Sequence, residues 1–293
     1  MKTLCAVFGV GAAWLATASA PAAGTGDAMR VFVTIQPQAY FVERVAGSRA
    51  RVSVLVGPGQ EPHTFEPTPR QIDALSDARV YVTIGLPMEA GLLQKVRAVS
   101  PGLAIVDSGA GVPRRATAQR GEPAAAAIAG EPDPHIWMSP RLAKLQAANI
   151  AAGLSAADPA GATDYAANLT RFQEDLDKLD ARITERLAPF RGRSFYVFHP
   201  AFEYFAADYG LREVPIETGG REPGAKSLAA VIDRMKTEKA AVVFVEPQFS
   251  PKNARAVAAA TGAAVETIDD IARDYMANME DIAEKLQRAF SKR

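Results

Sequence analysis

Cysteine is almost absent from this chain of 293 residues. The one cysteine, Cys5, lies in an apolar stretch at the N-terminus, and the stretch continues after it, which argues against a lipid anchor there. A single cysteine cannot form an intrachain disulfide. If the stretch is removed on export, the rest of the chain contains neither a cysteine nucleophile nor a thiolate metal ligand.

An excess of charge and a long apolar run are also absent. Lys and Arg together number 33, and Asp and Glu together number 33. This balance gives no electrostatic reason to expect a nucleic acid or an anionic membrane as partner. Beyond the N-terminal stretch there is no run of about 20 apolar residues that could span a bilayer. We therefore expect a soluble mature protein.

The N-terminus has the pattern of a signal peptide. A positive charge near the start precedes a short apolar segment, and Ala18-Ser19-Ala20 supplies the small residues of a cleavage site. We predict a signal peptide over residues 1–20 and export to the periplasm. Because Pro21 is unfavourable directly after a cut, cleavage at Ala22 or Ala23 is an alternative. The competing interpretation is a buried N-terminal helix.

Short β-rich runs alternate with helical patterns along the rest of the chain, which is typical of βαβ units and parallel sheets. Its length exceeds what one hydrophobic core usually fills. We predict an α/β protein of two lobes, each with a four-stranded, mainly parallel sheet flanked by helices. The predicted strands are Val31–Gln36, Arg51–Val56, Val80–Gly85 and Ala104–Asp107 in the first lobe, and Phe195–Phe198, Glu213–Ile216, Val242–Val245 and Val265–Ile268 in the second.

One long amphipathic helix is predicted between the two sets of strands. Apolar residues recur there at spacings of three and four from Tyr165 to Leu187, with charged residues between them. Such a stripe indicates a helix with one buried side, and prolines before and after it limit its length. We predict that a helix over residues 161–190 joins an N-terminal lobe at 27–160 to a C-terminal lobe at 191–293.

The chain has only three histidines, and all three occupy similar positions. His63 and His135 each follow a predicted strand of the first lobe, and His199 ends a predicted strand of the second. Each has a proline beside it, which stops a strand or helix from continuing through. Open α/β sheets place their ligands beyond the carboxyl ends of strands. One such histidine would indicate only a solvated loop side chain, but three in equivalent places indicate a shared site.

Three neutral imidazoles are typical of a zinc site, and zinc usually takes a fourth ligand in a tetrahedron. That ligand could be a carboxylate or water. Asp269 follows the last predicted strand and is our candidate, although it could instead cap the final helix. The predicted metal ligands are therefore His63, His135, His199 and Asp269. Copper and nickel also favour imidazole, so ligand type alone does not exclude them.

Six short motifs lie in order along the chain. They are Gly57-Pro58-Gly59 with Pro62-His63-Thr64-Phe65-Glu66-Pro67, Gly85 through Glu89, Asp133-Pro134-His135-Ile136-Trp137, His199-Pro200-Ala201-Phe202-Glu203-Tyr204-Phe205, Phe244-Val245-Glu246-Pro247-Gln248 and Ile268-Asp269-Asp270-Ile271. Together they resemble the zinc- and manganese-binding receptors of bacterial ABC importers, the cluster A-I substrate-binding proteins, over essentially the whole mature chain. The resemblance implies two lobes joined by one long helix, a metal ion in the cleft between them, and delivery to an inner-membrane permease.

The same resemblance assigns the three histidines to the family's ligand positions and Asp269 to its carboxylate position. Many members have proline after that aspartate, whereas this chain has Asp270, so either aspartate could be the fourth ligand. Manganese receptors of the family have glutamate in place of the third histidine. His199 therefore favours Zn²⁺ over Mn²⁺ as the transported ion.

Two other functions fit parts of the sequence. A zinc hydrolase would also use histidines and a metal-bound water, but neither a His-Glu-x-x-His nor a Gly-x-Ser-x-Gly pattern is present. An adhesion protein would be expected to carry repeats or an added module, and the sequence has none. We therefore expect a monomeric periplasmic receptor, not an enzyme, that delivers Zn²⁺ to an ABC permease and has no nucleic-acid partner.

Overall fold

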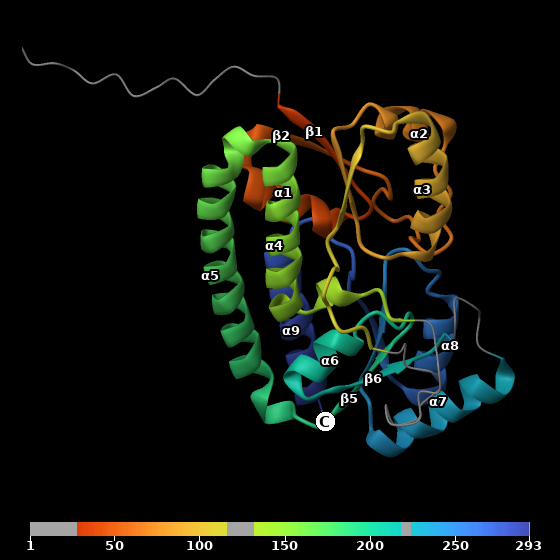
Figure 1. The fold of residues 1–293 in the computed structure, drawn as a ribbon. Helices are drawn as coiled ribbons and strands as arrows, with labels where there is room; N and C mark the ends of the chain where they lie inside the picture. Colours follow the sequence, from red (N-terminus) through yellow and green to blue (C-terminus); the bar gives the residue numbers. More distant parts are fainter. Residues whose placement is uncertain (1–27, 116–131, 218–223, 293) are drawn as a thin grey trace, which may run out of the picture.

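The computed structural model describes residues 28–115, 132–217 and 224–292, and these form two four-stranded sheets (Figure 1). The first sheet has the order β2-β1-β3-β4, and its strands are β1 (Met29–Val33), β2 (Ala50–Val54), β3 (Val80–Thr83) and β4 (Ala104–Asp107). The second has the order β6-β5-β7-β8, and its strands are β5 (Ser194–Val197), β6 (Arg212–Pro215), β7 (Val242–Val245) and β8 (Ala264–Thr267). All neighbouring strands are parallel. The predicted α/β class and the two sheets are confirmed. The predicted signal peptide lies outside the described residues.

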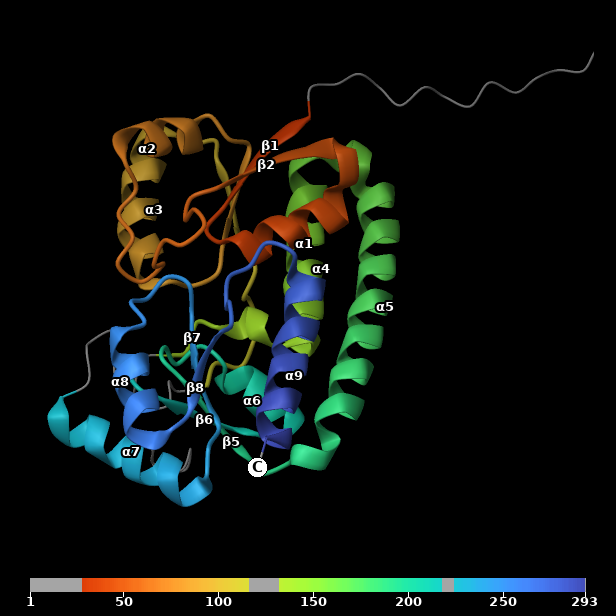
Figure 2. The same cartoon turned by 180° about the vertical axis from the view of Figure 1, so that it is seen from behind.

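Helices cover both faces of the first sheet (Figure 2). They are α1 (Gln36–Ala46), α2 (Pro69–Ser76), α3 (Pro87–Val99) and α4 (Pro140–Ala157). Successive side chains of a strand point to opposite faces. In β1, Val31 and Val33 belong to the apolar cluster that includes α1 and α4, whereas Phe32 packs with residues of α2 and α3. Covering both faces explains why these strands are apolar almost throughout.

The second sheet is covered in the same way. Its helices are α6 (Glu203–Tyr209), α7 (Ala225–Glu238), α8 (Lys252–Thr261) and α9 (Tyr275–Ser291). In β5, Phe195 and Val197 join the apolar cluster that includes α6 and α9. Tyr196, between them, packs instead with Met235 of α7 and Val257 of α8. The two sheets are therefore built on one plan, with apolar layers on both sides.

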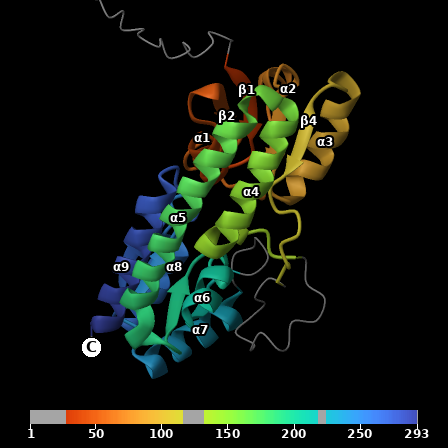
Figure 3. The same ribbon diagram turned by 60° about the vertical axis from the view of Figure 1, so that its left-hand side comes forward.

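The helix α5 (Ala162–Leu187) is 26 residues long and contacts α1, α4 and α9 (Figure 3). Its predicted apolar stripe is buried at Tyr165, Phe172, Leu176, Leu179, Ile183 and Leu187. These side chains belong to one continuous cluster that reaches Val31 of the first sheet and Phe244 of the second. Bending the lobes against each other would disrupt both the helix and this shared core. We therefore expect little hinge motion between the lobes.

The sequence patterns missed α4. The helix begins after Ser139, whose hydroxyl accepts a hydrogen bond from the Leu142 backbone N–H, as an N-cap residue does. Much of its buried side consists of alanine, at Ala143, Ala147 and Ala151. Alanine favours helices strongly, but its small side chain gives a weak amphipathic signal. Over the described ranges, no helix is long and apolar enough to cross a membrane.

Candidate metal centre

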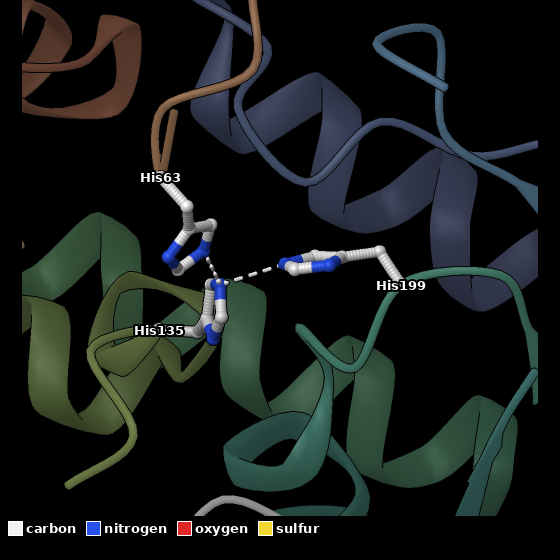
Figure 4. A group of neighbouring side chains, drawn as sticks. All are labelled: His63, His135 and His199. Carbon is white, nitrogen blue, oxygen red and sulfur yellow. Dashed lines mark hydrogen bonds between the residues drawn. The ribbon is translucent and has the colours of Figure 1, made fainter. Parts of the chain in front are cut away.

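The structure brings the three histidines together (Figure 4). His63 comes from the loop between β2 and α2, His135 from the segment between β4 and α4, and His199 from the loop after β5. The Nε2 atom of His135 lies 3.2 Å from Nε2 of His63 and 3.2 Å from Nε2 of His199. His135 is therefore the central member of a group whose ring nitrogens converge on one point. The Asp269 side chain is not part of this group.

A carboxylate holds the backbone of each histidine in place. Glu61 accepts the His63 N–H at 2.8 Å and, with its other oxygen, the N–H of the next residue at 2.7 Å. Asp133 accepts the N–H of His135 at 2.9 Å, and Glu246 accepts the N–H of His199 at 3.1 Å. These bonds fix three irregular loops where no sheet or helix satisfies the backbone.

Two of the imidazoles also bind a carboxylate through the ring. Nδ1 of His135 lies 2.7 Å from Oδ1 of Asp133, and Nδ1 of His199 lies 2.7 Å from Oε1 of Glu217. Both carboxylate residues are buried. An ionised carboxylate can only accept hydrogen bonds, so each Nδ1 carries the proton. In the neutral imidazole, Nε2 is then left unprotonated and available to a metal.

The consequence is that two Nε2 lone pairs face each other at 3.2 Å, in the pair formed by His135 and His199. Such an arrangement is repulsive unless a positive charge lies between the nitrogens. A shared proton could join only one pair, whereas a metal ion could bind all three nitrogens. For a tetrahedral zinc ion with Zn–N bonds of about 2.0–2.1 Å, adjacent nitrogens are about 3.3 Å apart. The observed separations fit such an ion.

His63 differs from the other two because the described residues offer no carboxylate to its ring. Burial, together with the nearby imidazoles of His135 and His199, lowers the pKa of His63 to about 3. The neutral form, which binds metals, is therefore favoured at ordinary pH. Aromatic side chains flank the other two rings. Phe249 stacks on His199 with ring centroids 4.9 Å apart, and Trp137 meets His135 edge-on at 5.1 Å.

Two aspartates follow β8, and their side chains have different surroundings. Oδ1 of Asp269 accepts the N–H of Ile271 at 2.9 Å and the side-chain amide of Gln248 at 3.2 Å, so this carboxylate stabilises a turn. Oδ1 of Asp270 is buried and has no hydrogen-bond partner among the described residues. Burial raises the pKa of Asp270 to about 6, and the electrostatic influence of nearby His199 opposes this rise.

Sequence reasoning did not find the carboxylates that contact the rings. Asp133 could have been identified, because it precedes His135 by two residues. Glu217 could not, because it is 18 residues from His199 and meets it only through the pairing of β5 with β6. In that pairing Val197 lies opposite Pro215, so the residues two positions further on face each other. The order of strands in the sheet supplies this contact.

Known proteins resemble the chain over most of its length. A family model described as zinc-uptake complex component A, periplasmic (ZnuA), matches residues 31–289. The high-affinity zinc uptake system protein ZnuA of Bacillus subtilis (strain 168) is 30% identical over 256 residues, which cover 84% of this chain and 79% of that protein. The chain spans 50% of the length of the zinc-binding lipoprotein AdcA of Streptococcus pneumoniae, at 28% identity.

Solved structures agree with these sequence matches. A crystal structure of ZnuA has a TM-score of 0.85 and 42% sequence identity, covering 90% of this chain and 100% of that chain. The laminin-binding protein Lmb of Streptococcus agalactiae, described as a bifunctional protein with adhesin and metal transporting activity, has a TM-score of 0.79 at 25% identity. That match covers 90% of this chain and 100% of Lmb.

Proposed function

Because the chain belongs to the family of the periplasmic zinc-uptake component ZnuA, we propose that it captures one Zn²⁺ ion and delivers it to the permease of an ABC importer. We assign the capture to His63, His135 and His199. One observation carries this assignment: the Nε2 atoms of His135 and His199, with their Nδ1 atoms held by carboxylates, face each other at 3.2 Å beside His63. A cation that binds all three nitrogens removes their mutual repulsion.

The donor set supports zinc over manganese. Imidazole nitrogen suits Zn²⁺, whereas Mn²⁺ favours carboxylate, carbonyl and water oxygens. Copper and nickel also bind imidazole, and Cu²⁺ usually binds a given site more tightly than Zn²⁺. The family supports Zn²⁺ as the cargo, because its members include zinc uptake proteins.

We propose that an aspartate after β8 supplies the fourth ligand. Asp269 was the position predicted from the sequence, but its Oδ1 is engaged in the turn. Asp270 fits the role better, since its Oδ1 is buried without a partner among the described residues and its side chain lies close enough to His199 for an electrostatic interaction. Asp270→Asn should then weaken zinc binding more than Asp269→Asn does. The opposite order would assign the ligand to Asp269, and two small effects would assign it to water.

If an aspartate fills the fourth position, the closed coordination sphere favours transport over catalysis. Catalytic zinc sites keep one position for a reactive water, whereas structural or carrier sites fill it. An aspartate in the fourth position, with Phe249 and Trp137 beside the histidine rings, would leave no such water. We therefore propose that the protein is not an enzyme.

The remaining parts of the proposal concern the whole chain. Residues 1–20 serve as the signal peptide for export to the periplasm. Residues 27–160 and 191–293 form the two lobes, and residues 161–190 form the helical connection between them. The protein acts as a monomer, because both lobes contribute ligands within one chain.

Competition among metals tests the proposed function. The mature protein is stripped of metal and titrated with Zn²⁺, Mn²⁺, Cu²⁺ and Ni²⁺ against a chelating indicator. We expect one Zn²⁺ per chain and binding far tighter than that of Mn²⁺, because the site is rich in nitrogen. Tighter binding of Mn²⁺ than of Zn²⁺ would contradict the proposal. So would a protein that fails to compete with the indicator for Zn²⁺.

A further inference from the structure

Arg114 joins the first sheet to the loop that carries His135. It lies in the segment that follows β4, close to the end of the first described range. Its Nη2 donates to the carbonyl oxygen of Ile84, at the end of β3, at 2.7 Å. Its Nη1 lies 3.3 Å from the carbonyl oxygen of Pro134 and 3.4 Å from that of Asp133. One guanidinium group thus holds the strand end and the two residues before the central histidine.

Two glycines make room for this guanidinium. A Cβ atom on Gly109 would lie 2.3 Å from Nη2 of Arg114, a separation that real Cβ atoms do not show. A Cβ atom on Gly85 would lie 3.0 Å from the same nitrogen, and Gly85 has a φ of +93°, which other residues rarely adopt. Gly109 has no such positive φ, so its substitution tests the available space, which is bounded by the Arg114 guanidinium and, at 3.0 Å from that Cβ, by Cδ1 of Ile136.

The contacts of Arg114 leave the Asp133 side chain free for His135. Arg114 donates hydrogen bonds to the backbone carbonyl oxygens of Asp133 and Pro134. The side-chain Oδ1 of Asp133 accepts both the backbone N–H and the ring Nδ1–H of His135. On the other side of the same turn, the Tyr204 hydroxyl of α6 donates to the Asp133 carbonyl at 3.2 Å. Arg114 therefore ties the turn to the N-terminal lobe, and Tyr204 ties it to the C-terminal lobe.

Only an arginine suits this position. Its planar group presents several N–H donors in a fixed geometry and can serve carbonyl oxygens on two segments together. The ammonium group of lysine is compact and cannot reproduce that fork. Among the described residues Arg114 forms no ion pair, and its side chain binds three backbone carbonyl oxygens.

We propose that Arg114 is a positioning residue of the zinc site, a role that rests on the proposed function. It fixes the Asp133-Pro134-His135 turn relative to β3. The Nε2 atom of His135 is thereby kept at bonding distance from the same ion as His63 and His199. Arg114 touches neither the imidazoles nor the metal, and it acts through the loop that it holds.

The test compares Arg114→Met, Arg114→Lys, Gly109→Ala and the double variant Gly109→Ala/Arg114→Met with the wild type. Zinc affinity is measured by competition with a chelator, and ligand geometry by the visible spectrum of the Co²⁺-loaded protein. We expect Arg114→Met to weaken zinc binding about 10-fold, the lower end of the range for losing a direct outer partner of a metal ligand, because Arg114 holds the backbone of such a partner and not the ligand itself. Gly109→Ala should have a similar effect, because its methyl group displaces the guanidinium. Arg114→Lys should fall between Arg114→Met and the wild type.

The double variant and a matched control separate positioning from general stability. If both changes act through the same guanidinium, the double variant should be no weaker than Arg114→Met alone. The control is Arg44→Met, because Arg44 is also half-buried and links α1 to Asp175 of α5 at 2.7 Å, with no contact to the histidines. It should lower the melting temperature of the apo protein and leave zinc affinity and the Co²⁺ spectrum unchanged.

Zinc affinities of Arg114→Met and Gly109→Ala within twofold of the wild type would overturn the inference. So would fully additive losses in the double variant, or equal losses of affinity in Arg44→Met. Failure of the wild type itself to bind zinc would instead contradict the proposed function. The two failures can therefore be told apart in one set of measurements.

Discussion

The two lobes have the same strand order but differ in how their buried polar groups are satisfied. At the carboxyl edge of the first sheet, the Glu89 carboxylate accepts hydrogen bonds from the Thr34 hydroxyl and from three backbone N–H groups of the β3–α3 turn. In the second lobe, buried side-chain oxygens lack a hydrogen-bond partner among the described residues at Glu213, Glu246, Gln248, Asp270 and Tyr275. In the first lobe the same is true of Asp133 and Gln146.

The first lobe therefore holds its buried Glu89 with four hydrogen-bond donors, whereas most of the unpaired buried oxygens belong to the second lobe. A buried acceptor without a partner is unfavourable. Burial accordingly raises the pKa of Glu213 and of Glu246 well above the usual range of a carboxyl group. A bound cation would relieve part of this cost, because it compensates the negative charge of carboxylates around it.

The contrast between the lobes would be wrong if His199, the histidine of the second lobe, were not needed for zinc binding. We expect His199→Ala to reduce zinc affinity by more than the roughly 10–100-fold typical of losing an outer partner, since it removes a metal ligand itself. A ligand that binds only the folded state raises its stability by mass action. The zinc-induced rise in melting temperature should therefore largely disappear. An unchanged rise, measured by calorimetry with a tenfold excess of Zn²⁺, would contradict histidine ligation at this position.

A substitution in the first lobe away from the histidines should lower the free energy of unfolding and leave the zinc affinity nearly unchanged. Glu89→Gln keeps the size of the side chain but replaces one of the two oxygens that four donors share with an amide group that cannot accept their hydrogen bonds. A buried donor left without its acceptor costs about 1–3 kcal/mol, so we expect the apo protein to lose roughly 2–3 kcal/mol in urea unfolding. Zinc affinity should change less than about threefold, because Glu89 lies in the scaffold. A large loss of affinity with unchanged stability would reverse the contrast between the lobes.

The third prediction concerns the pH dependence of stability. Burial raises the folded-state pKa of Glu213, with smaller contributions from the charges of Asp133 and Glu203. The unfolded chain therefore releases this proton at lower pH than the folded protein does. The stability that the protonated group contributes is present below about pH 4.5 and is lost as the pH rises toward the folded pKa.

Glu213→Gln cannot ionise and should not show this loss. Its stability relative to the wild type should increase between pH 4.5 and 7.5, by at most about 1.4 kcal/mol per pH unit. Urea unfolding of both apo proteins across this range gives the measurement, and Val214→Ala in the same strand serves as a control without an ionisable side chain. Parallel curves for wild type and Glu213→Gln would show that the raised pKa has no effect on folding.

Much of the fold could be predicted because its signals are local. The eight strands and the long helix appear in the sequence as apolar runs and as a stripe from Tyr165 to Leu187, and the observed ends differ by a few residues at most. The ends of β1 shift because the Gln38 side chain accepts the N–H groups of Thr34 and Ile35, which turns the chain into α1. The helix α4 was missed because its buried face is rich in alanine.

The site could be predicted only in part, because its supporting contacts are not local. The three histidines were recognisable by their rarity and their positions after strands. Glu217 reaches His199 through strand pairing, and Arg114 reaches the His135 loop through space left by Gly109. Neither contact can be predicted from the spacing of residues in the sequence. The choice between Asp269 and Asp270 likewise depends on which side chain the turn after β8 leaves unpaired.

X-ray absorption at the zinc edge tests the central claim most directly. The mature protein is loaded with one equivalent of Zn²⁺ and the first coordination shell is measured. The account predicts three imidazole nitrogens at about 2.0–2.1 Å and one oxygen ligand at a similar distance. A shell with fewer than three imidazoles, or one made mainly of oxygen, would contradict binding by His63, His135 and His199.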